Sequence, residues 1–198
     1  TRNKDGLAGA MIGLGAAAKV FPGLALPALA LARRREGKAM GPLVISTILW
    51  FAIPNAIVLA YAGIDGWWFP WGFQSTRLPN FETVWYFVLH HGQGWWDFGN
   101  DFWFGGDYAR VAQLASTMMF GVFSLLLLWR ESKREQFRPI TTAFGIVILF
   151  LMTAKVFSPQ YAIWLLPFFV LVRVPWHAFV AYVVGDLLAL TAVWTYFT

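Results

Sequence analysis

The sequence predicts an all-α integral membrane protein with about six transmembrane helices and a long tryptophan-rich loop. Of the 198 residues, 59% are hydrophobic and only 13% are charged, whereas a soluble domain carries roughly 25% charged residues. The mean hydropathy is +0.58. The net charge of +5 comes from short connectors between apolar runs, where membrane topology explains it. We therefore expect membrane lipids, not nucleic acid, as partners, and the lack of Cys excludes disulfides and thiolate sites.

The apolar runs define the expected spans, since a bilayer core requires about 20 apolar residues per helix. The predicted segments are 7–32, 41–62, 111–129, 139–157, 159–172 and 175–197. The connectors 33–38 and 130–138 hold four basic residues each, and Arg173 lies in a third short turn. Basic connectors favour the cytoplasmic side. The alternation then places the N-terminus, the 63–110 loop and the "FSPQY" segment on the extracytoplasmic side.

Two of these segments are irregular. Residues 7–32 would form a helix of about 39 Å, and Pro22 and Pro27 predict a bend near Phe21 and Pro22. Residues 159–172 are short for a span, so we expect "SPQY" to lie below the outer surface, against protein or a cavity. Gly9 and Gly13 have the small-xxx-small spacing that favours close helix packing.

The 63–110 loop holds seven of the twelve tryptophans, a composition that argues against disorder. Residues 80–91 predict a short helix lying on the membrane. Two interpretations of the aromatic residues stay open, an interfacial belt or a platform for sugar and lipid. The candidate platform residues are Trp68, Trp71, Trp85 and Trp96.

Two lysines occur in the same phrase, "AKVF" followed by a proline, at Lys19 and Lys155. Lys19 precedes Arg33 by 14 residues, about 21 Å along a helix, and Lys155 is near the outer end of its span. A single such lysine is explained by snorkelling to the headgroups. A pair of intramembrane cations indicates a functional site, and it suits a lipid-linked phosphate. Arg77 is a further outer cation, either a bidentate phosphate ligand or a solvated loop charge.

The sequence does not identify a catalytic residue. A glycosyl transfer needs a carboxylate to accept the proton of the acceptor hydroxyl, and the nearest approach to an acidic pair is "DFGND", with Asp97 and Asp101. His90 and His91 lack a helical partner for a metal, so no metal site is expected. Asp186, in the last span, is explained by a buried polar contact.

The stretch "GLAGAMIGLGAAAKVFPGLALPALALARRR" (6–35) resembles bacterial polyprenol-phosphate-mannose-dependent mannosyltransferases of glycosyltransferase family eighty-seven, and the enzyme that adds the first mannose of the GPI anchor. "STRLPNFETVWYF" (75–87) and "AKVFSPQYAIWLLP" (154–167) are similar to later segments of that enzyme, in the same order. The resemblance implies a GT-C helix bundle, a polyprenyl-phosphate sugar donor, an inverting transfer and a glycolipid or glycan acceptor. It implies donor-phosphate binding by Lys19, Lys155, Gln160 and Tyr161.

In these families the catalytic acidic residue usually lies in the first extracytoplasmic loop. We therefore expect residues 1–198 to be a single transmembrane domain from the C-terminal part of a larger protein. Three functions stay open: a mannosyltransferase of the bacterial inner membrane with no cofactor beyond its lipid-linked donor, a non-catalytic subunit or scaffold that binds other membrane subunits, and a transporter of lipid-linked sugars.

Overall fold

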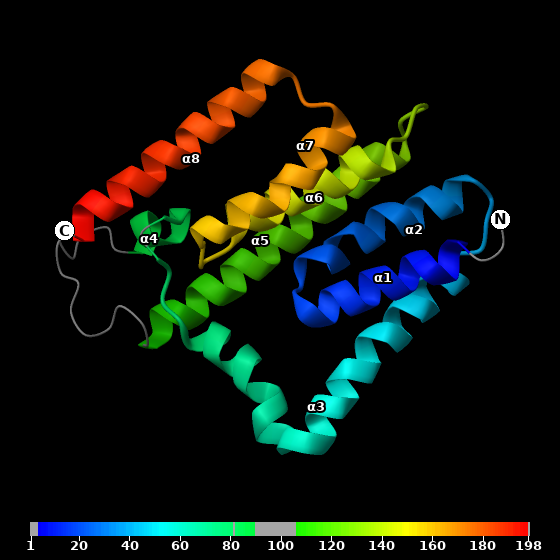
Figure 1. Ribbon diagram of the computed structural model, residues 1–198, viewed down its shortest axis with the longest axis horizontal. Helices are drawn as coiled ribbons and strands as arrows, with labels where there is room; N and C mark the ends of the chain where they lie inside the picture. Colours follow the sequence, from blue (N-terminus) through cyan, green and yellow to red (C-terminus); the bar gives the residue numbers. More distant parts are fainter. Residues whose placement is uncertain (1–3, 81, 90–105, 198) are drawn as a thin grey trace.

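The structure, a computed structural model, describes residues 4–80, 82–89 and 106–197 (Figure 1). These ranges contain helices and no strand, which confirms the all-α fold class. Two helices are long and apolar enough to cross a membrane, α3 (Gly41–Thr76) and α5 (Gly106–Ser132). The helices α6 (Pro139–Thr153), α7 (Leu166–Val172) and α8 (Trp176–Phe197) are apolar but do not meet the same criterion. The expected number of six spans is therefore not confirmed.

The first predicted segment is a helical hairpin, not a bent span. It consists of α1 (Lys4–Ala18), the short 3-10 helix η1 (Phe21–Ala25) and α2 (Leu26–Arg35). The break falls where Pro22 was expected to bend the chain, because proline cannot donate a helix hydrogen bond. Figure 1 shows α2 running back beside α1, and Arg33 forms an ion pair with Asp5. The two ends of the hairpin thus lie together, and placing the N-terminus across the membrane from connector 33–38 was wrong.

Close packing of α1 on α3 depends on two glycines. A Cβ atom at Gly9 would lie 2.4 Å from the carbonyl oxygen of Leu43, and one at Gly13 would lie 2.3 Å from that of Thr47. Both distances are far below van der Waals contact, so only glycine fits. The Ser46 hydroxyl also donates to the Gly6 carbonyl at 2.6 Å. The small-residue packing predicted for Gly9 and Gly13 is confirmed.

Helix α3 follows the predicted span to its end and then continues in a new direction. At Gly63 the backbone has φ 68°, ψ −176°, a conformation that glycine adopts readily, and the ribbon turns sharply there (Figure 1). The indole N–H of Trp67 donates to Asn55 Oδ1 at 2.9 Å across this bend. Residues 64–76 are therefore helical, where a loop was expected. Helix α4 (Val84–Leu89) lies within the predicted 80–91 helix.

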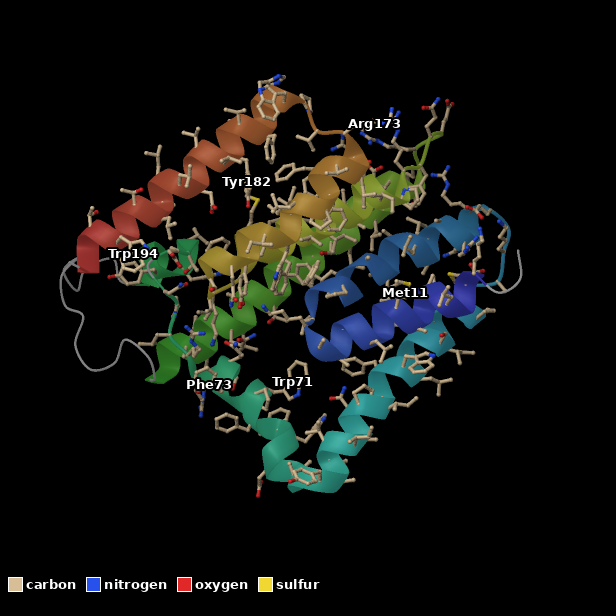
Figure 2. The ribbon with its side chains drawn as sticks, in the orientation of Figure 1. Met11, Trp71, Phe73, Arg173, Tyr182 and Trp194 are labelled. Carbon is tan, nitrogen blue, oxygen red and sulfur yellow. The ribbon has the colours of Figure 1, made fainter. Side chains whose placement is uncertain are left out.

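The basic connectors gather at one end of the molecule, which we call the basic end. Arg35 donates to the carbonyl oxygens of Glu131 at 3.1 Å and Glu135 at 3.5 Å, so connectors 33–38 and 130–138 touch. Figure 2 shows Arg173 near the same end. Between the ends, Ala28, Ala143 and Ile146 form a buried core that joins α2 to α6, with Phe120 and Leu127 of α5 against it.

The expected irregular backbone follows α6. Helix α6 ends at Thr153, residues 154–158 form a non-helical connector that bends at Lys155 and Val156, and the 3-10 helix η3 (Pro159–Leu165) leads into α7. Proline at the start of η3 fixes φ without removing a needed hydrogen bond. This connector lies at the end opposite the basic end, beside the starts of α4 and α5 (Figure 1).

Candidate functional site

Lys155 lies at the centre of the connector after α6. Its side chain is only 4% exposed, and its ammonium donates to the carbonyl of Ser75 at 2.7 Å and more weakly to that of Ala109 at 3.4 Å. These carbonyls belong to the last turn of α3 and the first turn of α5. Lys155 therefore joins three helices through a single positive charge.

The charge on Lys155 has an unusual setting. The pKa of Lys155 is lowered to about 8, chiefly by burial and to a smaller extent by repulsion from the neighbouring Arg77 guanidinium. No carboxylate pairs with Lys155 among the residues that the structure describes. A buried cation that has only carbonyl partners is costly, and an anion bound beside it would restore its usual pKa.

Asn80 holds the connector in place, a role that the sequence analysis missed. Its side-chain oxygen accepts the Phe157 N–H at 2.9 Å, and its side-chain nitrogen donates to the Phe157 carbonyl. Its backbone N–H donates to the Lys155 carbonyl at 3.2 Å. The only signal in the sequence is the Pro79–Asn80 dipeptide, which marks a turn but does not indicate a partner 77 residues away.

Lys19 lies at the tip of the α1–α2 hairpin, and it reaches the segment after Lys155 through an aromatic stack. Its ammonium is 5.3 Å from the centroid of the Trp164 ring. Trp164 stacks on Phe21 at 4.7 Å and on Tyr161 at 4.3 Å. Trp164 is thus a second residue that the sequence analysis missed, although it lies one turn after Tyr161. The Lys19 side chain itself is exposed.

Three more predicted phosphate ligands lie near these lysines. Gln160 is exposed on η3, and Tyr161 is half-buried, with its ring also 5.9 Å from that of Phe157. The Arg77 guanidinium is 5.7 Å from the Phe73 ring centroid, directly after α3 ends. The structure therefore brings Lys19 and Tyr161 together through Trp164, on the hairpin side of the connector. Gln160 precedes Tyr161 on η3, and Arg77 lies on the Lys155 side.

The candidate platform tryptophans separate into different environments. Trp68 and Trp71 are 57% and 40% exposed on the second part of α3, and Figure 2 shows Trp71 within the bend of that helix. Trp85 is 7% exposed, and its indole N–H donates to the Thr153 carbonyl at 2.6 Å. Trp85 therefore packs α4 on the end of α6. Trp96, Asp97 and Asp101 lie outside the described residues.

Glu82 is a carboxylate near the connector. It accepts a 2.7 Å hydrogen bond from the Asn80 side chain, and burial raises its pKa despite that bond. Asp186 lies on the face of α8 that looks toward Glu82, and both side chains line one cavity. Within the described ranges, no group of three or more His, Asp or Glu side chains is placed to hold a metal.

The end opposite the basic end therefore combines cations, exposed aromatic rings and a partly buried carboxylate. Cations at a membrane surface suit a phosphate, and stacked rings beside them suit an apolar or sugar group. The model of glycosyltransferase family 87 matches residues 1–159, a range that includes Lys19, Arg77 and Lys155. No curated protein and no solved structure matches the chain.

Proposed function

Since the chain belongs to glycosyltransferase family 87, and so to the membrane glycosyltransferases, we propose that it moves mannose from a polyprenyl-phosphate donor to a lipid or glycan acceptor. The basic end faces the cytoplasm of a bacterial inner membrane, following the charge preference of cytoplasmic connectors. The connector around Lys155 then faces outward, at the depth where the phosphate of a membrane-anchored donor lies.

The observation that carries this proposal is the meeting of the two lysine segments. Although 136 positions separate Lys19 from Lys155, Trp164 contacts the Lys19 segment, and it belongs to the 3-10 helix that directly follows the Lys155 connector. Both cations thus lie at the end of the molecule opposite the basic end. A phosphate bound there touches the exposed Lys19 ammonium, Gln160 and Tyr161, while Lys155 and Arg77 supply positive potential from the other side.

The chemistry follows from this charge distribution. When the acceptor hydroxyl attacks the anomeric carbon from the face opposite the phosphate, the configuration inverts and negative charge develops on the departing phosphate. Fixed cations stabilise that charge in the transition state more than in the ground state, and this difference is what accelerates the reaction. Asp97 and Asp101 remain proposed bases for the acceptor proton.

The test is the double variant Lys19→Met and Lys155→Met in the full-length protein, assayed in membranes with radiolabelled polyprenyl-phosphate mannose. We expect transfer to the lipid or glycan fraction to be abolished. The matched control is Lys133→Met, because Lys133 also lies over a tryptophan ring, 3.9 Å from the Trp129 centroid, but at the basic end. Full turnover by a folded double variant would refute the donor-phosphate role.

A further inference from the structure

A cavity of about 720 Å³ lies between α6 and α8, below the start of α4. This volume is within the range of roughly 300–1,000 Å³ that small-molecule sites occupy. Figure 2 shows Tyr182 extending from α8 toward α7 and this space. The lining includes Met152 and Ala154 at the end of α6, Phe157 and Leu165 around η3, and Leu190 on α8.

The charged side chains that line the cavity are acidic. Glu82 and Asp186 are both part of its lining, whereas no Lys or Arg is among the described residues that line it. A carboxylate in an apolar surrounding strongly disfavours a second anion nearby. The cavity therefore excludes the phosphate of the donor, which the cations on the other side of the connector attract. An uncharged ligand with hydroxyl groups suits it better.

Glu82 is placed to bind such a hydroxyl. One of its oxygens, Oε2, accepts from Asn80 at 2.7 Å, and Oε1 has no hydrogen-bond donor among the residues described. The same Asn80 side chain binds Phe157, two residues after Lys155. Asn80 therefore contacts both the cavity wall and the connector of the proposed donor site, so a hydroxyl at Glu82 lies close to that site.

Access to the cavity is from the apolar flank of the molecule. Leu187 and Leu188, on the neighbouring faces of α8, are 56% and 65% exposed, as expected for residues that face lipid. At Gly185, which lines the cavity, a Cβ atom would have nothing within 4 Å. An acyl or alkyl chain therefore has an open, apolar path past α8 into the cavity.

We propose that this cavity binds the apolar chain of an uncharged, hydroxyl-bearing lipid acceptor, whose hydroxyl donates a hydrogen bond to Glu82. The assignment rests on the proposed transferase function, since it names the acceptor class of that reaction. Donor and acceptor then approach the connector from opposite sides, the donor phosphate from the hairpin side and the acceptor from the α8 side.

The first experiment measures binding without any donor. Purified full-length protein in lipid nanodiscs is photolabelled with a diazirine-bearing alkyl glucoside, and labelled peptides are mapped by mass spectrometry. We expect label on peptides containing Met152 and Leu190. The variant Gly185→Leu fills the cavity from its open wall, and it should reduce this labelling about tenfold. Gly121→Leu is the matched control, because Gly121 of α5 also has open space but lies away from the cavity, and it should label like the wild type.

Three outcomes would overturn the proposal. One is equal labelling of the cavity peptides in Gly185→Leu and in the wild type. Another is equal labelling of these peptides by the glucoside probe and by a probe with the same alkyl chain and a phosphate headgroup. The third is cross-linking between protein chains at these peptides, which would identify a protein as the occupant. If Gly185→Leu does not fold, Ala181→Leu on the preceding turn fills the same cavity and serves instead.

The second experiment separates this inference from the proposed function. In the transfer assay, Glu82→Leu and Gly185→Leu should raise the KM for an alkyl glycoside acceptor about tenfold and leave the KM for the donor unchanged. Lys19→Met should do the reverse. Unchanged acceptor KM in both cavity variants would refute the acceptor site alone, whereas an unchanged donor KM in Lys19→Met would refute the donor site alone.

Discussion

Lys19 and Lys155 each follow an alanine and precede Val-Phe, and both lie at the end of the molecule opposite the basic connectors. Their surroundings differ. Lys19 is exposed at the tip of a hairpin, where its partner is the face of Trp164. Lys155 is buried, and its partners are the carbonyls of Ser75 and Ala109.

The difference teaches that the same four-residue phrase can serve two physical roles. Lys19 can reach a ligand directly, since a cation over a ring at an exposed site gains only about 0.5–1 kcal/mol from that contact. Lys155 is bound within the fold, and in the proposed site it would act on a ligand through its charge. The comparison also predicts different consequences when each lysine is replaced.

The largest effect is expected for Lys155→Met. It leaves the partly buried carbonyl of Ser75 without its Lys155 donor, which costs about 1–3 kcal/mol, and it removes the charge beside the proposed phosphate. We expect a lower free energy of unfolding in mixed micelles together with loss of transfer. Lys19→Met should change stability by less than about 0.5 kcal/mol. Equal destabilisation by the two variants would remove the distinction between them.

A second prediction concerns a substitution that shifts the position of Lys19 without replacing it. In Gly13→Ala, the new Cβ would lie 2.3 Å from the Thr47 carbonyl, so α1 must shift on α3, at a cost of about 1–3 kcal/mol. The donor KM should rise because the hairpin tip moves. Gly6→Ala is the control on the same helix, because a Cβ there has nothing within 4 Å. A normal donor KM in a destabilised Gly13→Ala would show that the tip position does not matter.

A smaller effect is expected for Trp164→Leu. It removes the ring that Lys19, Phe21 and Tyr161 share, each contact being worth about 0.5–1.5 kcal/mol. The donor KM should rise several-fold, with little change for the acceptor. Trp129→Leu, which removes the ring beneath Lys133, is the control at the basic end. An identical response to both substitutions would argue for a general packing effect.

The smallest effect concerns pH. The pKa of Lys155 is lowered from 10.5 to about 8, so between these values the unfolded chain binds more protons than the folded one, and stability rises with pH. Donor affinity should move the other way and fall as pH rises through about 8. Lys155→Arg keeps its charge at alkaline pH and should lose this decline. Donor affinity that is flat from pH 7 to 9.5 in the wild type would contradict the role of the Lys155 charge.

Much of the fold could be predicted because apolar runs and prolines act locally. The end of the second predicted span coincides with the bend at Gly63, the break near Pro22 is real, and the glycine spacing indicates a true contact. The reversal of the first segment could not be predicted, because a proline indicates a break but not the direction in which the chain continues, and the Arg33–Asp5 ion pair joins residues 28 positions apart. The predicted alternation agrees with the contact between connectors 33–38 and 130–138, and it disagrees with the pairing of Asp5 and Arg33.

The charged residues of the candidate site could be predicted, but the residues that hold them in place could not. Lysines in apolar runs are visible in any sequence, so Lys19 and Lys155 were found. Asn80 and Trp164 were missed because their importance comes from partners far along the chain, Phe157 and Lys19. The sequence also does not show which tryptophans are buried. Trp85 is buried and Trp68 is exposed, although both occur in the predicted aromatic loop.

The α1–α2 hairpin has a mechanical consequence. The Asp5–Arg33 ion pair holds its two ends together at the basic end, and α1 packs closely on α3 at Gly9 and Gly13. Lys19 lies at the tip of the hairpin, about 21 Å from Asp5 along α1. The ion pair therefore fixes the hairpin at the basic end, and Lys19 is at the end furthest from it. We therefore expect neutralisation of Asp5 to change the position of Lys19, at the opposite end of the hairpin.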